Sequence, residues 1–354
     1  MTETVPERGR LKKELSAFIL ITFLATAIFI SVIYLISGPI SMPPSRLWYV
    51  SFQACMQIPG TVAILCMVFF RSRLLTRGAR TVFAFFLVYV IVFSFESYYR
   101  PIAGMRSMPI VALHPTAVDL PLLSMIVAFA GILTVIALNS KKRWREALEL
   151  SRLSFGKHAG NYPALTLVLS GMIVLTFILD YVSGSGAPAK EFDLTRFFAT
   201  VVSSSVLSFL LLWPNYFGEE YGWRAYLQDR LFPLLGARRG VLVLGIIWGL
   251  WHAPLILAGL FFPGKPVLGI AFMVLSTIVM GIIFSYAVLK TGSVWIAVVL
   301  HMIADTIYPA AQCFIAVSRD PIFSFGTGMY GLALIAVLAL ILLRSKVWRS
   351  EHTA

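Results

Sequence analysis

The sequence has few charged residues and few cysteines, and each shortage excludes a class of protein. Only 13% of its 354 residues are charged, while 59% are hydrophobic. Soluble domains carry roughly 25% charged residues, so this chain has too little polar surface to fold in water. The cysteines, Cys55, Cys66 and Cys313, are odd in number and widely spaced, which supports neither a disulfide framework nor a CxxC metal site.

Acidic residues are scarcer than basic ones, with 16 Asp and Glu against 29 Lys and Arg and a formal net charge of +13. An excess of this size can indicate a nucleic-acid ligand. Here, however, the basic residues lie in short loops between apolar runs, which is typical of the positive-inside rule for membrane proteins. The sequence therefore predicts a lipid bilayer, and no nucleic acid, as the surroundings of the chain.

Long hydrophobic runs make up most of the sequence. A helix needs about 20 apolar residues to cross the bilayer core, and ten runs qualify or nearly qualify. They predict an all-α, polytopic transmembrane bundle of about ten helices, with eight or nine as the alternatives. The first run is followed by no clear cleavage site, so we interpret it as a retained helix rather than a signal peptide. The runs are 15–37, 47–70, 81–97, 118–138, 162–183, 196–217, 240–260, 267–289, 292–310 and 326–343.

Basic clusters precede the first run and follow the second, fourth, sixth and tenth runs. With ten spans they all fall on one side, which predicts a multi-pass protein of the plasma (inner) membrane with both termini in the cytoplasm. The longest loop on that side, 139–161, is either an amphipathic surface helix or a solvated linker. No internal repeat is evident, so an inverted-repeat transporter has no support in the sequence.

A charged cluster, Glu219-Glu220-Tyr-Gly-Trp-Arg224, closes the sixth run. Glu220 and Arg224 are four residues apart and share one face of a helix, with Glu before Arg in the favourable order. Glu219 is rotated by about 100° from Glu220, so one carboxylate can pair with Arg224 while the other points elsewhere. The alternative, given equal weight, is an ordinary cluster of charges where a helix meets the membrane interface.

Two histidines lie inside later apolar runs. His252 follows Trp248 by four residues in the seventh run, and His301 precedes Asp305 by four in the ninth. Asp305 could orient the imidazole of His301 or bind a metal itself. The alternatives are a packing histidine at His252 and a plain hydrogen bond between helices at His301.

Ionisable groups inside a membrane cost about 2.5–3.5 kcal/mol each to insert, so their accumulation in one half of the chain indicates a functional site. A carboxylate to activate water, and imidazoles to hold a metal or stabilise an oxyanion, are the minimum set for hydrolysis. The sequence contains neither HExxH nor GxSxG, which excludes a zincin and a serine hydrolase of the nucleophile-elbow type.

A pair of small residues, Gly245 and Gly249, forms a GxxxG pattern on the helix that carries His252. Small residues at this spacing allow a neighbouring helix to approach closely. We expect this contact to hold the helices of His252 and His301 at ligand distance.

The order EExxxR, aromatic-xxx-His and His-xxx-Asn/Asp on successive helices resembles the CPBP family. This family comprises the type II CAAX prenyl endopeptidases and bacteriocin-processing or immunity-associated membrane proteins, and is also called the ABI family. The resemblance covers about residues 195–310. The matching residues are Glu219, Glu220, Arg224, Trp248, His252, His301 and Asp305.

The resemblance implies an intramembrane glutamic protease or metalloprotease in which Glu219 is the general base that activates water. It implies that His252 and His301 either bind a metal or stabilise the oxyanion, with Asp305 supporting them. If a metal is bound, zinc is the candidate ion, since zinc sites typically use His and carboxylate ligands, and His252, His301 and Asp305 are its candidate ligands.

The same resemblance gives Glu220 and Arg224 a supporting role. Two positions depart from the family pattern. Trp248 stands where the family more often has Phe, and Asp305 stands where the prenyl endopeptidases tend to have Asn. The second departure weakens the case for a prenylated substrate.

These observations predict an endopeptidase that hydrolyses a membrane-anchored or membrane-spanning peptide or protein. The predicted organisation is a cytoplasmic tail (1–14), N-terminal transmembrane helices of unknown role (15–183), a catalytic core (195–310), and a last helix with its tail (311–354). The glutamate motif is expected near the cytoplasmic end of its helix, so that the site opens to the cytoplasm or inner leaflet. The alternatives are a non-catalytic immunity or scaffold protein of the same fold and, with less support, a secondary transporter.

Overall fold

The computed structural model describes residues 8–41, 44–72, 75–102, 122–188, 193–316, 322–325 and 328–349. In these residues the chain is an all-α bundle, as predicted, apart from a two-residue antiparallel pair of β1 (Ala187–Pro188) and β2 (Ile315–Ala316). The main helices are α1 (Arg8–Ser37), α2 (Arg46–Arg71), α3 (Arg77–Ser94), α5 (Leu122–Ser140), α6 (Lys142–Glu149), α7 (Tyr162–Val182), α8 (Leu194–Leu211), α9 (Trp213–Glu220), α10 (Gln228–Leu235), α11 (Ala237–Trp251), α12 (Ala253–Leu257), α13 (Pro266–Thr291), α14 (Trp295–Phe314) and α15 (Met329–Leu343).

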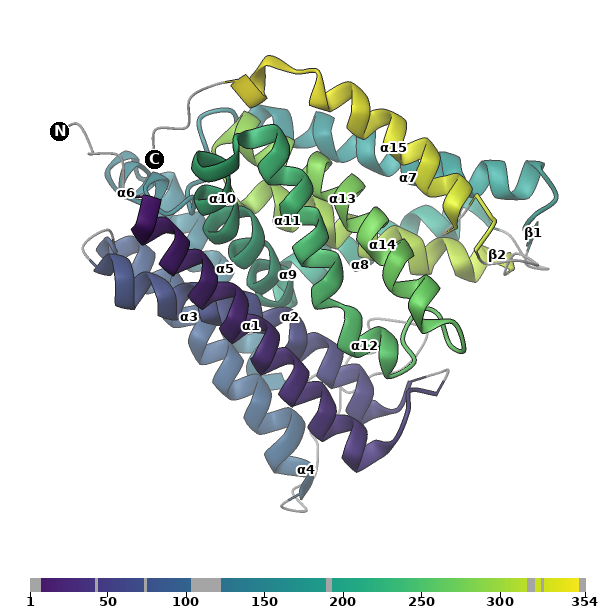
Figure 1. Ribbon diagram of the computed structural model, residues 1–354, viewed down its shortest axis with the longest axis horizontal. Coiled ribbons are helices and arrows are strands. Elements are labelled where there is room, and N and C mark those ends of the chain that lie inside the picture. The colour runs from purple at the N-terminus through teal and green to yellow at the C-terminus, as the bar shows by residue number, and fades with distance from the viewer. Residues whose placement is uncertain are drawn as a thin grey trace.

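Figure 1 shows α1, α2 and α3 along one side of the bundle and α7 and α15 along the opposite side. Between them lie α9, α10, α11, α13 and α14, which carry the motifs singled out in the sequence. The motif-bearing helices are therefore enclosed by the helices at both ends of the chain.

Within the described residues, ten apolar helices correspond to the ten predicted runs. Two of them, Trp295–Ala311 and Met329–Leu343, are shorter than the other eight. The chain is thus an integral, multi-pass membrane protein. In the part of the chain that the structure describes, eight helices are long and apolar enough to cross a membrane: Arg8–Ser37, Arg46–Arg71, Arg77–Ile102, Leu122–Ser140, Ala159–Val182, Leu194–Leu211, Ala237–Leu257 and Pro266–Thr291.

The sixth predicted run, 196–217, is wrong as a single helix. α8 ends at Leu211 and α9 begins at Trp213, with a break at Leu212. Pro214 occupies the first turn of α9, where its missing N–H removes no helical hydrogen bond. Hydropathy does not reveal this break because both sides of it are apolar.

The helix that starts at α9 continues through a π-helical turn, Tyr221–Leu227, into α10. We call this stretch, 213–235, the central helix. Glu219 and Glu220 lie in its first half, and roughly 22 Å of helix follows them, at 1.5 Å per residue. The expected position near the cytoplasmic end of the helix is therefore wrong, because the helix continues past the pair and the arginines that follow, Arg224 and Arg230, are buried in the bundle instead of lying in a loop.

Backbone contact between α2 and the central helix depends on glycine. A Cβ added to Gly218 would lie 2.4 Å from the Met56 carbonyl oxygen, and one added to Gly222 would lie 2.5 Å from Pro59 Cβ. Gly60 on α2 faces the backbone of Gly218 in the same way, at 2.7 Å. The N-terminal helices are therefore packed directly against the helix that carries the glutamate pair.

The GxxxG pattern on α11 also makes a close helix contact, but with a different partner from the one expected. A Cβ on Gly245 would lie 2.5 Å from Ile278 Cα, and one on Gly249 would lie 2.6 Å from Val274 Cα. Thr277 Oγ1 donates a hydrogen bond to the Gly245 carbonyl at 2.8 Å. All three partners belong to α13, so this pattern joins α11 to α13 and not to the helix of His301.

Helix ends from distant parts of the sequence meet at one end of the bundle. Arg230, near the end of the central helix, pairs with Glu14 at the start of α1. Arg238, at the start of α11, donates a hydrogen bond to the carbonyl of Leu343 at the end of α15. We call this end, where Arg230 and Arg238 lie, the basic end. The beginning of α1 and the end of α15 both lie at this end, as expected if the chain crosses the membrane an even number of times. That this end faces the cytoplasm stays a prediction.

The long basic loop 139–161 contains a helix, α6. Of the two alternatives for this loop, a helix and a solvated linker, the structure shows the helix. Its Leu148 is fully buried and lies 3.2 Å from the position that a Cβ on Gly78 would take. After α6, Arg152 forms an ion pair with Asp229 of α10 at 2.9 Å, and this carboxylate raises the pKa of Arg152. The loop is therefore anchored to the bundle at two points.

Candidate active site

Glu219 is a buried carboxylate with one fixed hydrogen bond. Its side chain projects from α9, the residue is 3% exposed, and its Oε2 accepts a hydrogen bond from Trp248 Nε1 at 2.8 Å. Trp248 lies on α11, so this bond ties the central helix to the helix of His252. A Phe at position 248 would have no N–H to donate. The Trp that stands here in place of the Phe more frequent in the family therefore adds a hydrogen bond to the predicted base.

His252 lies where α11 ends and α12 begins, just before Pro254. Its Nδ1 is 2.9 Å from the carbonyl oxygen of Trp248. Because a carbonyl only accepts hydrogen bonds, a neutral imidazole in this position carries its proton on Nδ1 and presents the lone pair of Nε2. The side chain is half-buried, so this free nitrogen can act on a reacting group.

Glu220 is held between a histidine and an arginine. Its Oε1 is 2.7 Å from His301 Nδ1, and its Oε2 is 3.3 Å from Arg224 Nε. The side chains of Glu220 and Arg224 are fully buried. The predicted pairing of Glu220 with Arg224 is confirmed. The two adjacent glutamates differ because Glu220 contacts His301 and Arg224, while Glu219 accepts a hydrogen bond from Trp248.

His301 and Asp305 lie on one face of α14, as their spacing predicts. The distance from His301 Nε2 to Asp305 Oδ2 is 3.6 Å, longer than a direct hydrogen bond. The Asp305 side chain is 46% exposed. Asp305 is thus the accessible member of the group, and the two ring nitrogens of His301 face carboxylates on opposite sides.

Arg224 is buried without hydrogen-bonded partners among the described residues. None of its three guanidinium nitrogens has one, although its Cζ lies 4.0 Å from the ring centre of Trp248 and 5.3 Å from that of Phe284. The π-helical turn that contains Arg224 is the kind of irregular helix often found at functional sites. Buried polar groups of this kind are nearly always hydrogen-bonded, so Arg224 is an unusual feature of the site, held by its ion pair with Glu220 and by the two aromatic rings.

Aromatic rings surround His301 on three sides, and two of them, Tyr216 and Phe284, lie outside the sequence motifs. Ring centres lie at 5.4 Å for Tyr216, 5.8 Å for Trp248 and 5.8 Å for Phe284. Tyr216 precedes Glu219 by three residues, so helical spacing alone could have placed it on the same face. Phe284 lies on α13, and no local spacing links it to the site.

A polar network behind the site comes from the N-terminal helices. Asn215 Oδ1 accepts hydrogen bonds from Gln57 Nε2 at 2.9 Å and from Tyr89 OH at 3.3 Å. Asn215 Nδ2 in turn donates to Gln53 Oε1. These contacts fix α9 one turn before Glu219, and they give the N-terminal segment a positioning role that sequence spacing could not show.

The structure brings together all the candidate residues, in two linked groups. Trp248 joins them, because it holds Glu219 and its ring centre lies 6.0 Å from that of His252 and 5.8 Å from that of His301. Glu220, Arg224 and Asp305 attach to this core through the ion pairs of His301 and the stacking of Arg224 on Trp248.

The described side chains do not fit a metal site with three protein ligands. Among them, no group of three or more His, Cys, Asp or Glu residues could hold a metal ion. The reason is visible at His301, whose Nδ1 is engaged by Glu220, while Asp305 lies on the far side of the same ring. Zinc held by His252, His301 and Asp305 stays a prediction.

Comparison with known proteins supports the resemblance. A family model described as "Type II CAAX prenyl endopeptidase Rce1-like" matches residues 201–307, a stretch that contains every candidate residue of the site. The chain is also 29% identical over 164 residues to "CAAX prenyl protease 2" of Methanococcus maripaludis, which covers 45% of this chain and 58% of the relative. The chain therefore spans a little over half the length of the curated relative that it matches.

Proposed function

We propose that this protein is an intramembrane endopeptidase that hydrolyses a peptide bond of a membrane-anchored substrate, because residues 201–307 match the Rce1-like family model and 164 residues of the chain are similar to a CAAX prenyl protease. The observation that carries the proposal is Glu219, a buried carboxylate held by Trp248, whose ring also lies beside the imidazoles of His252 and His301. This arrangement provides a base, a ligand for water and an oxyanion partner within one enclosed group.

In the first step, Glu219 removes a proton from a water molecule while the water oxygen bonds to the scissile carbonyl carbon. Glu219 Oε2 is engaged by Trp248, so Oε1 is the oxygen that takes the proton. The free Nε2 of His252 accepts the second hydrogen bond of the same water and orients it. The carbonyl π electrons move to oxygen, and a tetrahedral oxyanion results.

His301 stabilises this oxyanion. In its imidazolium form it donates one N–H to Glu220 and presents the other on Nε2, and the carboxylates of Glu220 and Asp305 offset its charge. In the second step the oxyanion electrons re-form the C=O bond, the C–N bond breaks, and Glu219 returns its proton to the leaving nitrogen. The products are a carboxylic acid and an amine, with no change of oxidation state. No step is assigned to a metal, because the described donors do not gather around one point.

The depth of the site supports a membrane-anchored substrate. Gly218 abuts Met56 on α2, about 15 residues and therefore roughly 22 Å along the helix axis from the basic end at Arg71. A peptide must enter the apolar bundle to reach Glu219, and a lipid or transmembrane anchor would bring it to that depth. Asp305 is the exposed member of the site, and it marks the side from which the peptide approaches.

The test compares purified wild type with Glu219→Gln on membrane-anchored reporter peptides, some prenylated and some not. A general base contributes about 10²–10⁴ in rate, so we expect the variant to lose at least about a hundredfold. Glu146→Gln, on exposed α6 with a side chain that is 61% exposed, is the matched control and keeps full activity. Equal cleavage by wild type and Glu219→Gln would refute the role of Glu219, and the prenylated arm decides whether a prenyl group is required.

A further inference from the structure

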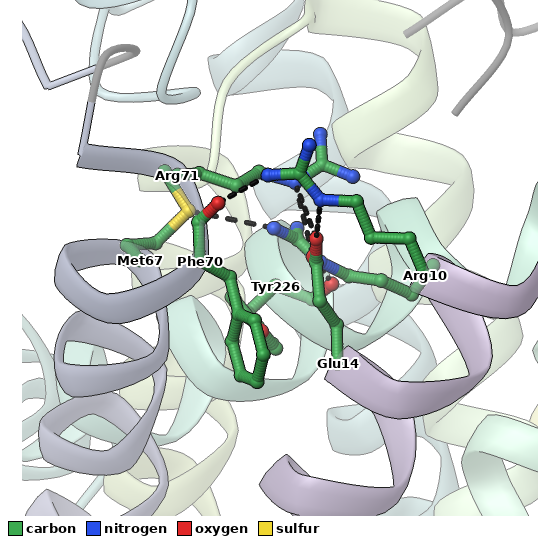
Figure 2. Close-up of polar contacts among 7 residues, drawn as sticks. Arg10, Glu14, Met67, Phe70, Arg71 and Tyr226 are labelled. Carbon is green, nitrogen blue, oxygen red and sulfur yellow. Dashed lines mark hydrogen bonds and ion pairs between the residues drawn. The ribbon is translucent and has the colours of Figure 1, made fainter. Parts of the chain in front are cut away.

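A second charged cluster lies at the basic end of the bundle, outside the candidate active site (Figure 2). Its centre is Glu14 of α1, whose side chain is fully buried. Three guanidinium groups from three helices donate to this carboxylate: Arg10 Nε at 3.1 Å, Arg71 Nε at 3.0 Å and Arg230 Nε at 3.1 Å. One carboxylate thus faces three cations, which leaves two positive charges in excess.

The three arginines are not equivalent. Arg230 is 6% exposed at its side chain, donates to the Tyr226 carbonyl and to Met67 Sδ, and stacks 3.7 Å from the centre of the Tyr226 ring. Its guanidinium is therefore fully used inside the protein. Arg10 is 52% exposed and donates to the Phe70 carbonyl as well as to Glu14.

Arg71 leaves its terminal nitrogens available. Only its Nε bonds Glu14, and neither terminal nitrogen has a hydrogen-bond partner among the described residues. Figure 2 shows these nitrogens directed away from Glu14. The side chain is 14% exposed. A planar pair of N–H donors with excess positive charge beside it is the arrangement that binds phosphate in a bidentate manner.

The surface beside this cluster is apolar. On α2, in the two turns that lead to Arg71, the exposed residues are Leu65 at 57%, Val68 at 53% and Phe69 at 79%. On α1, Leu20 and Leu24 are 60% and 52% exposed. Since both helices are long enough to span the bilayer, these side chains face acyl chains. A free anion would contact only the arginines, whereas a phospholipid would contact the arginines with its phosphate and the apolar side chains of α1 and α2 with its acyl chains.

We propose that Arg71 and Arg10 bind the phosphate of an anionic phospholipid at the basic end, with its acyl chains against the exposed flank of α1 and α2. The site depends on the bilayer leaflet at that end and is independent of the proposed peptidase activity. Because Arg230 of the central helix shares Glu14 with these two arginines, the lipid also strengthens the junction of α1, α2 and the central helix.

The proposal is tested by native mass spectrometry of the full chain in neutral detergent, with phosphatidylglycerol, phosphatidylcholine or glycerol phosphate added. We expect wild type to retain phosphatidylglycerol at least about tenfold better than phosphatidylcholine, and glycerol phosphate to compete only weakly. Arg10→Gln, Arg71→Gln and Arg71→Lys should each weaken retention, the last because it keeps the charge but loses the bidentate pair. Arg143→Gln, on the exposed side of α6, is the control and retains the lipid.

Arg71 also contacts Glu14, so each variant is first compared with wild type in thermal unfolding without added lipid. Arg10→Gln changes a half-exposed side chain and keeps the fold testable if Arg71→Gln unfolds. Retention of phosphatidylglycerol by folded Arg10→Gln or Arg71→Lys at the level of the Arg143→Gln control would overturn the site. Competition by glycerol phosphate as strong as that of the whole lipid would overturn the lipid and leave an anion site.

Discussion

Removing the indole donor of Trp248 tests how the predicted base is held. Trp248→Phe deletes the 2.8 Å hydrogen bond from Nε1 to Glu219 but keeps an aromatic ring for Arg224, whose Cζ lies 4.0 Å from the indole ring. A hydrogen bond to a charged group contributes about 1.5–3 kcal/mol. If Glu219 loses its fixed orientation, this corresponds to a fall in kcat of roughly tenfold to 150-fold.

The assay is the initial rate of reporter cleavage at several substrate concentrations. We expect kcat to fall while KM stays within about twofold, because Trp248 contacts the base and not the proposed path of the peptide. In the Glu219→Gln background the same substitution should cause no further loss, since the two residues then act as one unit.

The control is another buried tryptophan that loses an equivalent bond. Trp295 Nε1 donates to the Leu153 carbonyl at 2.9 Å, and this contact lies near the basic end rather than beside Glu219. Trp295→Phe should therefore lower thermal stability but leave kcat unchanged. A kcat for Trp248→Phe within twofold of wild type would show that the indole does not position the base.

Two further predictions concern the packing that supports the site. Glu14→Gln leaves three arginines around a neutral side chain, and breaking a buried ion pair costs about 3–5 kcal/mol. Thermal unfolding of this variant in detergent should therefore occur well below the wild-type temperature. The control, Glu146→Gln on exposed α6, should not shift the unfolding temperature. Gly218→Ala places a Cβ 2.4 Å from the Met56 backbone oxygen, so the yield of folded protein should fall sharply. Gly171→Ala, with nothing within 4 Å, is its control, and equal yields would refute close contact of α2 with the central helix.

Local spacing was sufficient to predict part of the site. Glu220 with Arg224, and His301 with Asp305, are four residues apart, and helix geometry alone places each pair on one face. The apolar runs likewise predicted the helices, because each must cover the thickness of a bilayer. Both kinds of prediction use information that lies within one helix.

What the sequence did not predict depends on contacts between helices. The break at Leu212 lies between two apolar stretches, so hydropathy does not detect it. The GxxxG pattern of Gly245 predicts a close neighbour but does not identify it, and the neighbour is α13. Glu14 looks like one more charge in a basic tail. Only Arg10 lies on the same helix, and its other two partners, Arg71 and Arg230, come from helices that are distant in sequence.

The π-helical turn Tyr221–Leu227 has a consequence for how one helix meets two sets of partners. A π-type turn accommodates one residue more than an α-helical turn, and one residue corresponds to about 100° of rotation. The turn therefore offsets the second half of the central helix relative to the first, so that Glu220 faces His301 while Arg230 faces Glu14. Deleting one residue from the turn would restore a continuous α-helical phase, and only one of these two contacts could then be kept. The length of this short turn sets the alignment between the candidate active site and the junction at Glu14.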